Sequence, residues 1–169
     1  MTTFFYLSSA VAVAATLLAI TRSHPVHALL YLIVSLLGVA AMMLTLGAPF
    51  AAMLEVIVYA GAVMVLFVFV VMLLNLGPGT RPDARAWLQA RYWFGPAVLS
   101  GVLLGLLIGM MEPLQSTIVA VREVSPKAVG VALFGPYLLA VELGSMLLLA
   151  GLVAAYHLGR SDAPRRGRA

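Results

Sequence analysis

Charged residues and cysteine are what this sequence has least of. Of its 169 residues, 9% are charged and 63% are hydrophobic, whereas a soluble domain carries about 25% charged residues. So few polar side chains cannot cover the surface of a soluble fold, which indicates an integral membrane protein. The lack of cysteine excludes disulfides, thiolate-held iron–sulfur clusters and a cysteine nucleophile in this chain.

Long apolar runs predict an all-α integral membrane protein with five transmembrane helices. A membrane-spanning helix needs about 20 apolar residues, and proline, glycine and polar residues separate the runs that approach or exceed this length. The predicted spans are residues 4–20, 26–46, 51–76, 94–111 and 134–158. We expect residues 1–159 to form a single transmembrane domain and residues 160–169 a basic tail.

The stretches between the spans carry three smaller predictions. Residues 80–91 are polar with interspersed apolar side chains and predict a short surface helix. Residues 115–130 are of mixed polarity and predict an outer loop. Pro136 is expected in the first turn of the last span, where proline is tolerated because its missing N–H would have no partner there.

Basic residues in short loops predict the orientation of the spans. With the N-terminus outside, eight basic residues lie on the inner side and two on the outer side. The inner eight are Arg22, Arg81, Arg85, Arg91, Arg160, Arg165, Arg166 and Arg168, and the outer two are Arg122 and Lys127. We therefore expect the N-terminus outside and the C-terminus in the cytoplasm. Because no basic residue precedes the first apolar run, we expect no cleaved signal peptide.

Two carboxylates lie within the predicted spans. At 1.5 Å per residue, Glu55 lies roughly 6 Å into the third span and Glu142 roughly 12 Å into the last. Each acid has two interpretations: Glu55 reaches the outer interface or belongs to a proton path, and Glu142 is a packing acid or a proton-path group. An acid at the centre of a span costs about 2.5–3.5 kcal/mol, and no basic residue lies within a span. Each acid therefore needs water or a partner subunit, which favours an obligate hetero-oligomer.

Tyr59 and Gly61 distinguish the middle of the third span. Tyr59 follows Glu55 by four residues, so the two share one helix face. Gly61 is the only glycine between Ala51 and Leu76. It permits close helix–helix packing, and it also permits a π-bulge that would turn the rest of the helix by about 100°.

Other binding chemistries find little support. His24, His27 and His157 share the inner side, which permits bis-histidine ligation, but they lie at the margin of the bundle and haem histidines usually lie within it. We expect no metal and no cofactor bound by this chain. The net charge of +4 comes from arginines in loops and the tail, a pattern typical of topology signals and not of nucleic-acid binding.

Several motifs resemble one family along nearly the whole chain. They are the His24-Pro25-Val26-His27 entry to the second span, Glu55-x-x-x-Tyr59-Ala60-Gly61-Ala62 in the third, Ser125-Pro126-Lys127-Ala128, and Phe134-Gly135-Pro136-Tyr137 with Glu142-Leu143. Together they are similar to the subunit J family of bacterial NADH:quinone oxidoreductase, respiratory complex I, whose mitochondrial counterpart is NADH dehydrogenase subunit six.

This resemblance implies a non-redox subunit with five spans in the membrane arm of the complex, in a bacterial inner membrane. Its expected partners are subunits A, H, K and N and the lipid bilayer, while NADH, FMN, iron–sulfur clusters and quinone are bound by other subunits. The resemblance further implies that the third helix switches between π-bulged and regular forms and gates a hydrated proton path. The implied switch residues are Tyr59, Gly61, Met64, Val65 and Phe67, with Glu55, Tyr59 and Glu142 as proton-path candidates.

Two alternatives remain open. The same kind of helix set occurs in subunits of multisubunit cation/proton antiporters and membrane-bound hydrogenases. A passive structural subunit that fills the space between pumping modules is the other alternative.

Overall fold

The computed structural model describes residues 2–23, 25–74, 90–111 and 123–160, which form helices without any strand. The elements are α1 (Thr2–Thr21), α2 (Pro25–Thr45), α3 (Pro49–Leu54), η1 (Glu55–Val63), α4 (Met64–Leu74), α6 (Ala90–Met111), α7 (Pro126–Leu133) and α8 (Leu138–Gly159). Because α3, η1 and α4 join one another without a break, they form one helix, here named the third span. The described residues contain five helices long and apolar enough to cross a membrane, which confirms the predicted all-α, five-span fold.

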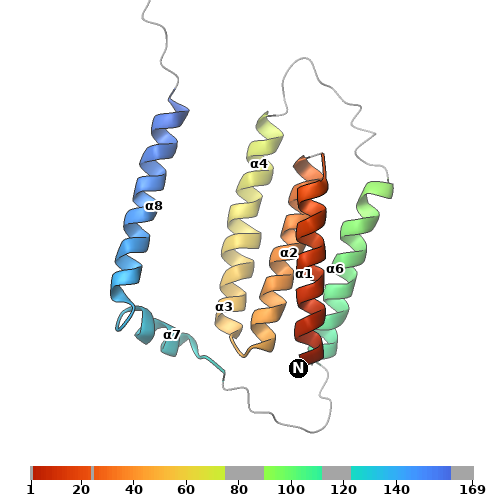
Figure 1. Cartoon of the computed structure of the whole chain (residues 1–169), viewed down its shortest axis with the longest axis horizontal. Coiled ribbons are helices and arrows are strands. Elements are labelled where there is room, and N and C mark those ends of the chain that lie inside the picture. Colours follow the sequence, from red (N-terminus) through yellow and green to blue (C-terminus); the bar gives the residue numbers. More distant parts are fainter. Residues whose placement is uncertain (1, 24, 75–89, 112–122, 161–169) are drawn as a thin grey trace, which may run out of the picture. The chain divides into compact units, whose positions relative to one another are not determined.

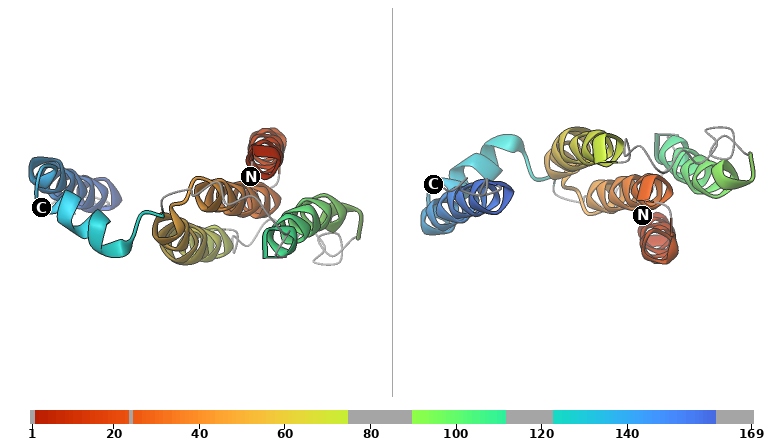
Figure 2. Two further views of the ribbon diagram at one scale, coloured as in Figure 1. Left: turned by 90° about the horizontal axis from the view of Figure 1, so that it is seen from below. Right: turned by 90° about the horizontal axis from the view of Figure 1, so that it is seen from above.

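Two compact units divide the chain, residues 1–125 and 126–169. In the first unit α2 contacts α1, α6 and every part of the third span, and the end-on views show it between them (Figures 1 and 2). A small apolar core joins α1, α2 and α6 through Val11, Ala15, Val34, Ala41 and Leu103. The second unit consists of α7 followed by α8, and none of the α8 side chains is buried.

A tight turn connects α2 to the third span. Gly47 has a φ of 77°, a left-handed conformation that glycine adopts without steric cost. The N–H of Ala48 donates to the carbonyl of Met43 at 3.0 Å, and the N–H of Gly47 donates to that of Leu44 at 3.1 Å. Pro49 then begins the next helix at a position where its missing N–H is not needed. The turn therefore fixes where the third span starts.

The sequence-based prediction places the start of the last span too early. Residues 134–137 form a turn, and α8 begins at Leu138. Pro136 lies within that turn and not in the first turn of the helix, so this prediction is wrong. The physical reason lies next to it: a Cβ added at Gly135 would come within 2.7 Å of the Val131 carbonyl oxygen. The close backbone approach at Gly135, followed by a proline without an N–H, separates the two helices.

The predicted loop at 115–130 is wrong over its last five residues. Pro126 begins the eight-residue helix α7, and proline suits the first helical position. Helix α6 begins at Ala90, and the part of it that is apolar enough to cross a membrane, Trp93–Met110, agrees with the predicted span to within one residue at each end. Of the surface helix predicted at 80–91, residues 80–89 lie outside the described residues, as do residues 75–76 of the third span and the tail from 161 onward.

Candidate functional site in the third span

The middle of the third span has a different backbone from its two ends. Residues Glu55–Val63 form a π-helix, whereas α3 before it and α4 after it are α-helical. At the exit the N–H of Met64 donates to the carbonyls of Tyr59 and Gly61. The bond to Tyr59 spans five residues, which defines π geometry and gives each turn more residues than an α-helix has. The structure therefore confirms the predicted π segment in the third helix.

Gly61 lies inside this π segment, against a backbone carbonyl. A Cβ added at Gly61 would be 3.2 Å from the carbonyl oxygen of Val56, five residues earlier. That separation is tighter than ordinary van der Waals contact, so a larger residue would require the backbone to shift. Glycine at this position is compatible with the π form, and a Cβ here would require the Val56 carbonyl to move by a few tenths of an ångström.

Buried residues lie at both ends of the π segment and not within it. Ala52 is 2% exposed before the segment and Met64 is 7% exposed after it, whereas none of residues 55–63 is buried. Beyond Met64 the less exposed side chains are Val68 and Val71, which come four and seven residues later on one helix face. The third span is thus anchored by packing on either side of its π turns.

Glu55 and Tyr59 belong to the π segment. The Glu55 side chain is half-buried, and Tyr59 is 53% exposed. Neither side chain takes part in a hydrogen bond between described residues. Both groups therefore have hydrogen-bonding capacity left for water or for another chain.

Glu142 lies nearer to the start of its helix than expected. It is exposed and four residues after the first residue of α8, about 6 Å along the axis, whereas Glu55 is six residues and about 9 Å into the third span. Counted from the first residue of its helix, Glu142 is therefore less far along than Glu55, because residues 134–137 do not belong to α8. The hydroxyl of Ser145 donates to the backbone carbonyl of Glu142 at 2.8 Å. This bond does not involve the Glu142 carboxylate.

The histidines do not assemble into a metal centre within the described ranges. There, no three His, Asp or Glu side chains lie close enough together to hold a metal ion. His24 is not among the described residues. His27 and His157 lie in different units of the chain, in α2 and α8.

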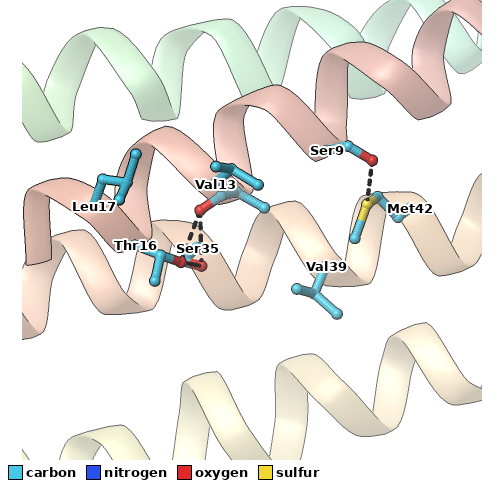
Figure 3. A pocket seen from close by; sticks show the side chains of 8 residues that line it. Ser9, Val13, Thr16, Leu17, Ser35, Val39 and Met42 are labelled. Carbon is cyan, nitrogen blue, oxygen red and sulfur yellow. Dashed lines mark hydrogen bonds between the residues drawn. The ribbon is translucent and has the colours of Figure 1, made fainter.

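Sequence reasoning missed a polar contact between α1 and α2. The Ser35 hydroxyl lies 2.7 Å from that of Thr16 and donates to the Ala12 carbonyl at 3.1 Å, and Ser9 donates to the Met42 sulfur at 2.7 Å. These side chains border an open cleft of about 340 Å³ between the two helices (Figure 3). Small polar residues on both helices are the signal that could have revealed it.

Comparisons with known proteins agree with the motifs. Residues 15–158 match the family described as NADH-ubiquinone/plastoquinone oxidoreductase chain 6. A protein of Pseudomonas aeruginosa called NADH-quinone oxidoreductase subunit J is 59% identical, over 94% of this chain and 96% of its own length. A protein of the same name from Escherichia coli is 53% identical, over 94% of this chain and 86% of its own length.

More distant relatives bear the same name. One from Buchnera aphidicola, of the subspecies Schizaphis graminum, is 44% identical over 92% of this chain and 96% of its own length. The three curated relatives align over 92–94% of this chain. Their extent and identity show that this chain is a multi-pass membrane protein of the NADH-quinone oxidoreductase subunit J family.

Proposed function

We propose that this chain gates a proton and water path that couples quinone reduction to proton pumping in a NADH:quinone oxidoreductase, through a change of register in its third span. The observation that carries this proposal is the π-helix at Glu55–Val63. A π-helix within an otherwise α-helical span can convert to a regular α-helix. When one turn contains one residue fewer, the rest of the helix rotates by about 100°. Such segments are frequent at functional sites.

Helix geometry identifies the side chains that the change would exchange. From Ala52, a regular α-helix returns to the same face after seven and eleven residues, at Tyr59 and Val63. In the structure that inner position is held by Met64, and Tyr59 is 53% exposed. Relaxation to an α-helix with Ala52 fixed would turn Tyr59 toward α2 and replace Met64 by Val63. The hydroxyl of Tyr59 would then enter or leave the interior together with the helix register.

Further parts of the proposal come from the family resemblance. The chain occupies the membrane arm of the complex in the bacterial inner membrane, with its N-terminus outside and its C-terminus in the cytoplasm. It contacts subunits A, H, K and N, carries no redox group of its own, and uses Glu55, Tyr59 and Glu142 as candidates for the path. Met64, Val65 and Phe67 move with the switch. The names of its relatives favour this function over that of a cation/proton antiporter or hydrogenase subunit.

The decisive experiment is Gly61→Val in the assembled complex. In the π form the Cβ of the added side chain lies 3.2 Å from the Val56 carbonyl oxygen, and overpacking of this kind costs about 1–3 kcal/mol. That cost corresponds to a shift of about 5- to 150-fold in the balance of the two forms. We expect quinone-linked NADH oxidation and proton pumping to fall, while NADH oxidation with an artificial electron acceptor continues at the wild-type rate.

Gly101→Val is the matched control, because a Cβ added at Gly101 in α6 meets no atom within 4 Å. It makes the same chemical change in another span and should leave coupled activity unchanged. Wild-type quinone reduction and pumping in Gly61→Val would contradict the gating role and favour the passive structural subunit.

A further inference from the structure

A backbone hydrogen bond joins the α2–α3 turn to a segment that comes much later in the sequence. The N–H of Val124 donates to the carbonyl of Gly47, with an N–O distance of 2.9 Å. Gly47 is buried, and a buried carbonyl requires a partner. Residues 123–125 are not helical, and α7 begins with the next residue. This bond therefore ties the last residues of the first unit to the turn.

The tied turn leads directly into the first turn of the third span. Pro49 begins the helix two residues after Gly47, and the N–H of Ala52 donates to the carbonyl of Ala48 at 3.0 Å. Ala52 is 2% exposed. At its other end the third span has no equivalent tie within the described residues. The half before η1 is therefore held by this bond as well as by the packing of Ala52.

We propose that the bond between Val124 and Gly47 is a latch that holds the first turn of the third span in its rotational register. This inference rests on the proposed register change. It states which half of the third span rotates in that change. If the half after η1 stayed fixed instead, the residue on the same α-helical face as Met64, eleven positions earlier, would be Met53. Met53, now 60% exposed, would then take the buried position of Ala52. The latch opposes that exchange, so that the residues after η1 rotate.

The test is Val124→Pro, which removes the N–H that donates to Gly47, compared with Val124→Ala, which retains it. The chain has no cysteine, so Ala52→Cys introduces a single thiol whose reaction with a membrane-permeant maleimide reports the register. In the assembled complex in its membrane we expect Val124→Pro to raise the labelling rate of Ala52→Cys about fivefold, the effect of losing one ordinary hydrogen bond. Val124→Ala should leave the rate unchanged.

Equal labelling rates in Val124→Pro and Val124→Ala would overturn the latch. If Val124→Pro prevents assembly, amide hydrogen exchange of the unaltered complex decides instead: the Val124 amide should be protected as well as the Ala52 amide, and exchange as fast as that of its neighbour Glu123 would overturn the proposal. Both measurements report structure and not pumping. Their failure is therefore distinct from failure of the gating function, which the Gly61→Val pumping assay reports.

Discussion

α1 and the third span pack against the same helix, α2, in contrasting ways. A Cβ added at Gly38 of α2 would lie 3.0 Å from the Ala12 Cβ of α1 and 3.2 Å from its Cα, so these two helices are in close backbone contact. Within the third span, by contrast, none of the nine residues of η1 is buried. The contact of α2 with α1 is therefore tight, whereas the π residues packed against α2 are not buried within this chain.

The contact between α1 and α2 also has side-chain hydrogen bonds that Glu55 and Tyr59 of the third span lack among the described residues. Ser35 of α2 bonds to α1 through the Ala12 carbonyl and the Thr16 hydroxyl, whereas Glu55 and Tyr59 have no described side-chain bond. In a membrane, helices associate through close packing and interhelical hydrogen bonds, because lipid supplies no hydrophobic driving force between them. The α1–α2 pair has both, so it is suited to serve as a fixed support for the change of register proposed for the third span.

The largest expected effect comes from disturbing the tight contact with Gly38→Val. A Cβ at Gly38 would lie 3.0–3.3 Å from three atoms of Ala12, so the helices must shift apart to accept the branched side chain of valine. Separation would also break the bond between Ser35 and the Ala12 carbonyl, so the loss exceeds that of overpacking alone. We expect little assembled complex in the membrane, measured by native gel electrophoresis.

Gly105→Val provides the comparison for this variant, since a Cβ at Gly105 meets no atom within 4 Å. It should assemble normally. Assembly of Gly38→Val at the wild-type level would show that the close approach of α1 and α2 is not required, and the contrast between the two sides of α2 would lose its basis.

The five-span fold was predictable because apolar run length alone determines whether a helix can cross a membrane. The ends of spans were less predictable, as α8 illustrates. Phe134 and Leu138 are both apolar, so hydropathy cannot distinguish a turn residue from a helical one. The break depends on a backbone contact between Gly135 and Val131, which appears only once the chain is folded.

The candidate site was predictable in part, for a similar reason. Gly61 permits a π turn, but the sequence of the third span is equally compatible with an α-helix, and it was the family resemblance that implied a switch. Burial of Met64 and exposure of Tyr59 depend on helix register, which composition does not specify. The bond between Val124 and Gly47 joins two backbone groups, and backbone groups leave no signature in the side-chain sequence.

An intermediate effect is expected at Glu55, the carboxylic acid of the π segment. Glu55→Gln keeps the size of the side chain and removes its ability to exchange a proton, so a proton-path role predicts slower pumping with an assembled complex. Glu142→Gln tests the second acid in the same way. Proton uptake by inverted membrane vesicles during NADH oxidation, normalised to the amount of complex, is the measurement.

Comparison of the two acid variants shows which of the two units, if either, contains the proton path. A pumping defect in Glu55→Gln alone would locate the path at the π segment. A defect in Glu142→Gln alone would move it to α8. Normal pumping in Glu55→Gln would mean that this carboxylate only reaches the outer interface.

The smallest expected effect is that of Ser35→Ala, which removes hydrogen bonds from the tight contact without adding volume. Interhelical hydrogen bonds in membranes contribute about 0.6 kcal/mol on average and at most about 1.7 kcal/mol, so we expect normal assembly and pumping with a slightly lower thermal midpoint of the purified complex. Ser145→Ala is the control, because its hydroxyl bonds to a carbonyl of its own helix, that of Glu142, and joins no two helices. A coupling defect in Ser35→Ala at unchanged thermal stability would mean that the α1–α2 pair takes part in the switch, which would remove the distinction between a fixed and a moving side of α2.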